Sequence, residues 1–83
     1  MLKRKTIRVE AIWDREAQVW VATSDDVPGL ITEADTSEQL IEKLQVLIPE
    51  LLRANGLINE NDPSDIPLHL LSKRTEMIKS RVN

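Results

Sequence analysis

The chain has 83 residues, a length that allows one domain with a single small hydrophobic core. It contains no cysteine and one histidine, which excludes disulfides and leaves a structural zinc site almost without ligands. No apolar run approaches the roughly 20 residues of a membrane-spanning helix, so we expect a cytoplasmic protein without a membrane anchor.

The net charge of −3 is unevenly distributed. Residues 1–8 carry +4, residues 9–72 carry −10 and residues 73–83 carry +3. An acidic body is a poor surface for a phosphate backbone and suits a basic protein partner instead. Nucleic-acid binding would have to use the basic ends, which come together only if the first and last strands are neighbours. The candidate nucleic-acid contacts are Lys3, Arg4, Lys5, Lys73 and Arg74.

The first part of the chain predicts three short strands. Residues 6–13 alternate, which places Ile12 on the opposite face from the other apolar side chains of this strand. A polar connection of hairpin length leads to a second β-rich segment, residues 18–24. A turn with Pro and Gly at residues 25–29 precedes a third strand, residues 30–34. The first two strands should pair as an antiparallel hairpin.

A helix should begin after Thr36, because residues 36–39 match a capping box. Leucines and isoleucines then recur at helical spacing until Asn55 and Gly56, which supply a stop. Pro49 interrupts the hydrogen bonding, so we expect one helix with a bend near Gln45. The residues expected at the centre of the core are Ile7, Val9, Val21, Leu40, Leu44, Leu47 and Leu51.

Residues 66–71 predict a fourth strand at a sheet edge, because Pro67 cannot donate to a ladder. The fold class is therefore α+β, with the order β-β-β-α-β: a three-stranded antiparallel meander, one long helix on one face, and the fourth strand beside the first. The expected strand order is 3-2-1-4. Residues 1–83 form a single domain, with a core of about residues 6–71 and a basic tail, residues 72–83.

Trp13 and Trp20 are the only aromatic residues, so each is either a core anchor or part of an interface. Strand alternation permits one of them to face away from the helix. Together with Ile12 they are our candidates for a partner or oligomer interface. A small domain without disulfides or metal, with one sheet face and its edges uncovered, is also expected to self-associate, most simply as a homodimer.

No set of residues has the pattern of a catalytic or metal site. His69 lies among Pro67 and three leucines with no fixed partner, and we interpret it as a strand residue. Asp25 and Asp26 can be read as an acid pair, although a turn before Pro28 explains them more simply. We therefore predict no enzyme activity, no cofactor and no metal. The other acidic residues considered, and interpreted as solvent-exposed or loop charges, are Glu10, Asp35, Glu38, Asp62 and Asp65.

Residues 7–52 resemble the HicB-like antitoxin domain family, and in particular its short, single-domain branch of uncharacterised bacterial proteins. The resemblance is carried by residues 19–22 in the second strand, residues 26–30 in the turn, and residues 32–40 running into the helix. It implies a degraded ribonuclease H-like fold without catalytic acids. In HicB proteins this domain blocks HicA, a small basic toxin that cleaves messenger RNA with a histidine.

Many HicB proteins continue into a DNA-binding segment, whereas about thirty residues follow the predicted helix here, so we expect no repressor function. The sequence therefore predicts a non-catalytic protein-binding module resembling a HicB-type antitoxin, with a HicA-like toxin as partner. The alternative is an RNA- or DNA-binding regulatory protein that uses the basic termini.

Overall fold

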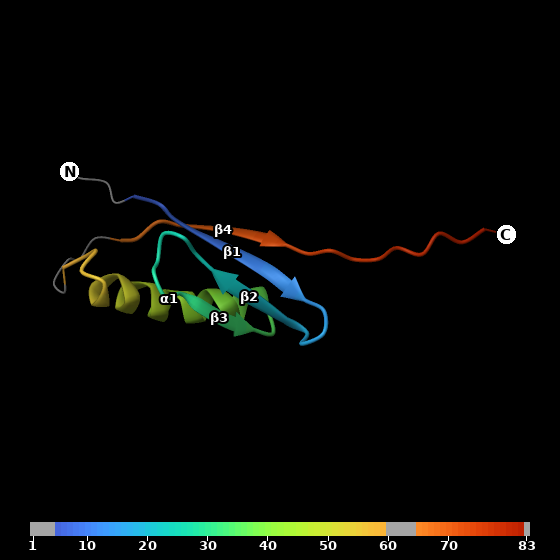
Figure 1. Ribbon diagram of the computed structural model, residues 1–83, viewed down its shortest axis with the longest axis horizontal. Coiled ribbons are helices and arrows are strands. Elements are labelled where there is room, and N and C mark those ends of the chain that lie inside the picture. Colours follow the sequence, from blue (N-terminus) through green and yellow to red (C-terminus); the bar gives the residue numbers. More distant parts are fainter. Residues whose placement is uncertain (1–4, 60–64, 83) are drawn as a thin grey trace.

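The computed structural model describes residues 5–59 and 65–82 and has the predicted α+β architecture. The elements follow the order β-β-β-α-β (Figure 1). They are β1 (Ile7–Asp14), β2 (Val19–Thr23), β3 (Ile31–Ala34), α1 (Ser37–Ala54) and β4 (Leu68–Lys73).

The four strands form one sheet in the order β3-β2-β1-β4, which confirms the predicted arrangement (Figure 1). β2 pairs antiparallel with both β1 and β3, while β4 pairs parallel with β1. β4 begins directly after Pro67, whose carbonyl accepts a 2.8 Å hydrogen bond from the Ile7 amide. It also ends two residues later than predicted, so Lys73 belongs to the strand.

A four-residue turn fixes the register between β1 and β2. The Gln18 amide donates to the Asp14 carbonyl at 2.8 Å, and the Asp14 carboxylate accepts from the amides of Glu16 and Ala17 at 3.0 and 3.2 Å. Gln18 adopts a φ of 58°, the left-handed conformation that closes the turn. As a result Trp13 lies directly opposite Trp20.

α1 begins as the capping box predicts. The Thr36 hydroxyl accepts a 3.1 Å hydrogen bond from the Gln39 amide. The helix ends at Asn55, followed by Gly56 with a φ of 70°. It continues through Pro49 without a break, which confirms one helix rather than two. In residues 5–59 and 65–82 no helix combines the length and apolar character needed to cross a membrane.

The core lies between α1 and one face of the sheet, and alanines form the centre of that face. Ala11 pairs with Ala22, and both are fully buried; Ala34 is 5% exposed. Their small size lets the helix approach closely, so that its long side chains fill the space. The buried core residues are Ile7, Val9, Ala11, Ala22, Val27, Leu30, Ala34, Leu40, Leu44, Ile48 and Leu52.

Three of the predicted core positions are only half-buried. On α1 the buried residues advance in steps of four, so Ile48 and Leu52 take the central places expected for Leu47 and Leu51. In β2 the pairing of Ala22 with Ala11 directs Ala22 toward the helix, and Val21 therefore points to the opposite face. The phase of β2 was the part of this prediction that was wrong.

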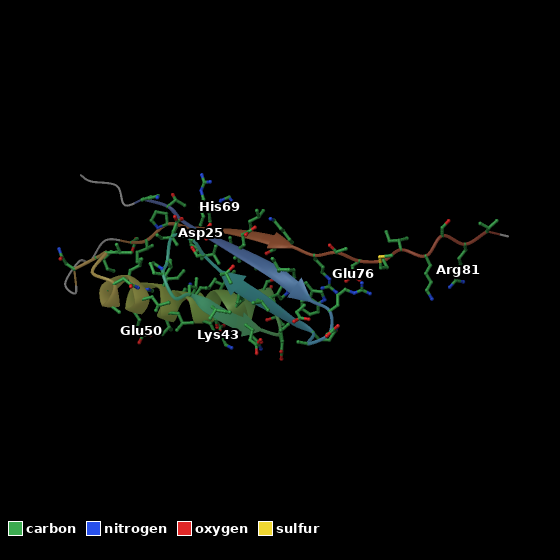
Figure 2. The ribbon with its side chains drawn as sticks, in the orientation of Figure 1. Asp25, Lys43, Glu50, His69, Glu76 and Arg81 are labelled. Atoms are coloured by element: carbon green, nitrogen blue, oxygen red, sulfur yellow. The ribbon has the colours of Figure 1, made fainter. Side chains whose placement is uncertain are left out.

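Beyond β4 the chain continues away from the body as an extended segment, residues 74–82, without helix or strand (Figures 1 and 2). Glu76 and Arg81 lie along it (Figure 2). All of its side chains are exposed. The loop predicted between the helix and the fourth strand falls largely on residues 60–64, outside the described residues.

Candidate interaction face

The sheet has a face that points away from α1, which we call the outer face. Strand register assigns its members, because residues paired across two strands lie on the same face. Within the described part of the chain, the only helix packs on the opposite side. The outer face consists of Arg8, Glu10, Ile12, Asp14, Val19, Val21, Thr23, Ile31, Glu33, His69, Leu71 and Lys73.

Large aliphatic side chains lie on this face in contact with solvent. Ile12 is 51% exposed, Ile31 is 73% exposed and Leu71 is 47% exposed. Ile12 pairs directly with the half-buried Val21. Leu71 on β4 and Ile31 on β3 are diagonal neighbours of this pair. Contiguous exposed apolar surface of this kind is typical of an interaction site. Of our interface candidates, only Ile12 belongs to the outer face.

The two tryptophans lie on the other side of the sheet, near its hairpin end. Their rings meet edge to face, with centroids 5.3 Å apart and an interplanar angle of 61°. Both are half-buried, and Trp20 packs against the core. The Arg74 guanidinium lies 4.3 Å from the centre of the Trp13 ring. Strand alternation had permitted one tryptophan to face away from the helix. The register places both on the helix side.

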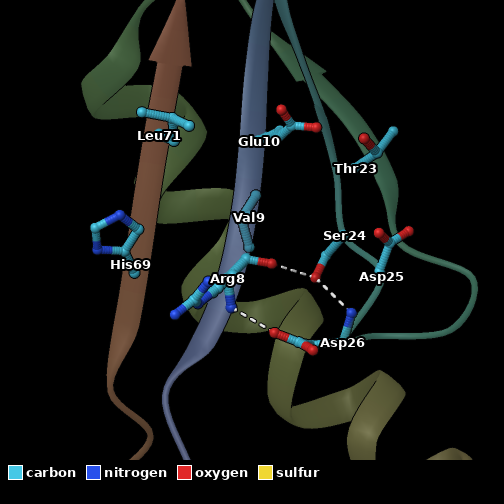
Figure 3. A pocket seen from close by; sticks show the side chains of 9 residues that line it. All are labelled: Arg8, Val9, Glu10, Thr23, Ser24, Asp25, Asp26, His69 and Leu71. Atoms are coloured by element: carbon cyan, nitrogen blue, oxygen red, sulfur yellow. Dashed lines mark hydrogen bonds between the residues drawn. The ribbon is translucent and has the colours of Figure 1, made fainter.

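A shallow hollow lies where the outer face meets the turn after β2 (Figure 3). At its base the Arg8 amide donates to the Asp26 carboxylate at 2.9 Å, and the Ser24 hydroxyl donates to the Arg8 carbonyl. The Asp26 amide in turn donates to the Ser24 hydroxyl oxygen at 3.0 Å. These side chains continue the β1 ladder after β2 has ended, and the Asp26 carboxylate bonds to an amide of β1 rather than to one within its own turn.

His69 lies on the β4 side of this hollow, across β1 from Asp25 and Asp26 (Figure 3). It is exposed, and its strand pairs it with Arg8 rather than with a carboxylate. Among residues 5–59 and 65–82 no three His, Asp or Glu side chains are close enough together to hold a metal ion. The hollow is therefore a surface feature of the outer face, with backbone-bracing hydrogen bonds at its base.

The basic candidates are divided between the two ends of the sheet. Lys5 precedes β1 and lies 3.8 Å from the Asp26 carboxylate, whereas Lys73 ends β4 and forms a 2.6 Å ion pair with Glu10. Arg74 follows Lys73 and also contacts Glu76 at 2.6 Å. Although β1 and β4 are neighbours as expected, their parallel register keeps Lys5 away from Lys73 and Arg74. Lys3 and Arg4 lie outside the described residues.

Sequence reasoning missed most of the outer face. Val21 had been expected in the core, Ile31 had been assigned to a strand without a known face, and Leu71 to a predicted edge strand. The signal that identifies them is the pairing of Ala11 with Ala22, because it fixes which residues of β2 and then β3 share a face with Ile12.

Comparison with known proteins identifies relatives across nearly the whole chain. Residues 6–80 match the model of a domain of unknown function, DUF1902. No curated protein matches the sequence. A solved structure, that of hypothetical protein TTHA1013 from the extremely thermophilic bacterium Thermus thermophilus, is 47% identical, covers 92% of this chain and 100% of its own, and superposes with a TM-score of 0.66. Neither match is named as a HicB protein or an antitoxin. Because the family model matches residues 6–80, the chain belongs to the DUF1902 family.

Proposed function

We propose that this chain is a non-catalytic protein-binding module of the HicB antitoxin type, which acts as a homodimer and neutralises a small basic, mRNA-cleaving toxin through its outer face. The observation that carries the proposal is the distribution of side-chain size on the sheet. The covered face has alanines at its centre, while the uncovered face presents Ile12, Ile31 and Leu71 to solvent. Burial of these side chains requires a partner.

The charge of the domain supports a basic partner. Residues 9–72 carry a net −10. On the outer face itself the Glu10 carboxylate is paired with Lys73, which leaves the exposed Asp14 and Glu33 for direct charge contact. The acidic body also acts over a longer range, since complementary net charge raises the rate of encounter more than the final affinity. The aliphatic side chains then supply the contact.

The alternative, a nucleic-acid-binding protein, has less support from the described residues. Its basic side chains lie at opposite ends of the sheet, and Lys73 and Arg74 are engaged by Glu10 and Glu76. A phosphate backbone is bound by a basic stripe or patch, and these positions do not form one.

The test begins with the neighbouring reading frames, and the absence of one that encodes a small basic, histidine-containing protein would count against the proposal. Where such a protein is encoded, it is co-expressed with the chain, and binding is measured by calorimetry and mRNA cleavage in vitro. We expect a stable complex that does not cleave mRNA. The double variant Ile12→Thr, Leu71→Thr should weaken binding at least about tenfold, because two apolar contacts are lost while the strands keep suitable residues.

Leu57→Thr is the matched control, since Leu57 is 55% exposed but follows α1 and lies outside the outer face. It should leave the affinity unchanged. An equal loss in both variants would contradict the assignment of the outer face. If the chain instead binds RNA with strong salt dependence, and substitution of Lys3, Arg4, Lys73 and Arg74 removes that binding without any protein partner, the antitoxin proposal fails.

A further inference from the structure

Residues 74–82, which we call the arm, project from the body (Figure 1). Arg74 and Glu76, at its start, lie beside Trp13 and the hairpin turn, and the side chains that follow are exposed. Met77 is 74% exposed, and Ile78 and Val82 are each 92% exposed. A compact domain of this length has a radius of gyration of about 12 Å. The value here is 16.1 Å, with a longest extent of 64 Å. The apolar side chains of the arm therefore find no burial within their own chain.

The arm has the sequence pattern of a strand with two different sides. Ile78 and Val82 share one side when the segment is extended, and the basic Lys79 and Arg81 share the other with Met77. The arm contains neither Gly nor Pro, the residues that commonly reverse the chain direction. This pattern favours an extended arm that buries the side with Ile78 and Val82.

A second feature, at the opposite edge of the sheet, has complementary properties. A mostly apolar groove runs between β3 and α1, with Val46 and Leu47 on its helix wall and Thr32 on its strand wall. Val46 is 61% exposed. Glu42 and Lys43 both line the groove, and Glu33 lies on the outer face beside it. We call it the β3 groove.

The backbone of β3 is also available at this edge. The Arg8 amide and carbonyl both point toward β2, because they bond to Asp26 and Ser24. The backbone groups of successive residues point to alternate sides of a strand, so the strand pairing fixes their direction in β2 and then in β3. The backbone groups of Thr32 and Ala34 therefore bond to β2, while the amides and carbonyls of Ile31 and Glu33 point to the open edge of the sheet. The Lys43 ammonium donates to the Glu33 carbonyl at 2.5 Å, which places that carbonyl on the open edge.

We propose that the arm of one chain adds as a strand to the β3 edge of a second copy, with Ile78 and Val82 in the β3 groove and Lys79 and Arg81 beside Glu33. The arm leaves from β4, and β1 and β2 separate β4 from its own β3. Since the arm carries neither Gly nor Pro to reverse its direction, the acceptor is another chain. Reciprocal exchange closes a two-fold dimer in which each copy gives one arm and receives one.

Charge favours this occupant over an unrelated one. The arm together with Lys73 and Asn83 carries +3, and the acceptor body carries −10. Strand addition replaces the Lys43 bond to Glu33 with backbone hydrogen bonds to Ile31 and Glu33. It also covers the exposed side chains of the arm and Val46, which have no burial in a single chain.

The inference rests on the self-association within the proposed function, and it is tested on the purified chain without a toxin. Sedimentation equilibrium should give twice the 9.5 kDa mass of one chain. Ile78→Asp in the arm and Val46→Asp in the groove should each raise the dimer dissociation constant at least about tenfold, because each places a carboxylate in an apolar contact. Leu57→Asp, at a similarly exposed aliphatic residue elsewhere, should leave it unchanged.

Mixing the two weakened variants tests reciprocal exchange. Each variant alone has no intact contact between arm and groove, but a mixed dimer has one: the normal arm of the groove variant in the normal groove of the arm variant. We expect the mixture to associate at concentrations where neither variant does so alone. A monomeric wild-type chain, a dimer unaffected by both variants, or a mixture without recovery would each overturn the proposal.

The outcome is separable from that of the toxin experiment. A monomeric arm variant that still binds the toxin leaves the outer-face proposal standing, because Ile12 and Leu71 lie outside the arm and the β3 groove. Conversely, a dimer that is broken by Ile12→Thr and not by Ile78→Asp would show that two copies meet through their outer faces, which contradicts the exchanged arm.

Discussion

The two faces of the sheet share one backbone and differ only in their side chains. Toward α1, the centre is formed by Ala11 and Ala22, which are fully buried. On the outer face, one position further along each strand, it is formed by Ile12 and Thr23, and Val21 lies directly opposite Ile12. The smaller side chains thus lie where the chain covers itself, and larger ones lie where it does not.

We expect this difference to separate folding from the proposed recognition of a partner. Small residues on the covered face bring the helix close, and the leucines of α1 supply the apolar volume. The outer-face side chains remain largely in water in a single chain, so they contribute little to its stability. Substitutions on the two faces should therefore have different effects, and neighbouring residues of one strand provide matched pairs.

The largest effect is expected for Ala22→Leu. A leucine at this fully buried position would push α1 away from the sheet, which should lower the free energy of unfolding by about 1–3 kcal/mol. Thr23→Leu adds an equally large side chain one residue later, on the outer face, and should change stability by less than about 0.5 kcal/mol. Urea denaturation of both variants measures the contrast, and equal losses would refute it.

Asp26→Ala should have an intermediate effect. Its carboxylate accepts the Arg8 amide and is only 24% exposed, so the variant should lose about 1 kcal/mol. Asp25→Ala, at the exposed neighbouring residue, should be close to neutral. Hydrogen exchange of the Arg8 amide would localise the change, because the amide should exchange faster only in the Asp26 variant. Faster exchange in both variants would mean that the turn as a whole holds β1.

The sequence was sufficient for the strand order and the helix boundaries because local patterns encode them. The Thr36 cap, the Asn55 and Gly56 stop and the parallel placement of β4 after a helical crossover all follow from short-range chemistry or from chain connectivity. Three consecutive apolar residues in β2, Val19 to Val21, carry no alternation. The faces of Val21 and Trp20 therefore could not be assigned from this segment alone.

What fixed those faces was the hairpin turn. Its length depends on the hydrogen bonds of Asp14 and on the left-handed conformation of Gln18. Gln is not a residue type that predicts a left-handed conformation from the sequence. The arm was missed for another reason. In the sequence, residues 72–83 are recognisable only as a basic tail, and only the three-dimensional path of residues 74–82 shows that they leave the body.

The smallest effect is expected for the ion pair between Lys73 and Glu10, which joins β4 to β1 on the outer face at 2.6 Å. Both side chains are about half exposed, at 57% and 49%, so water and salt screen their attraction. A double-mutant cycle of Glu10→Gln and Lys73→Met should give a coupling energy below about 1 kcal/mol, and less in high salt. On the covered side, Leu68 and Leu70 pack against the core and hold the same two strands together. A coupling energy above about 2 kcal/mol would mean that polar contacts on the outer face stabilise the sheet, and the division between a folding face and a recognition face would no longer hold.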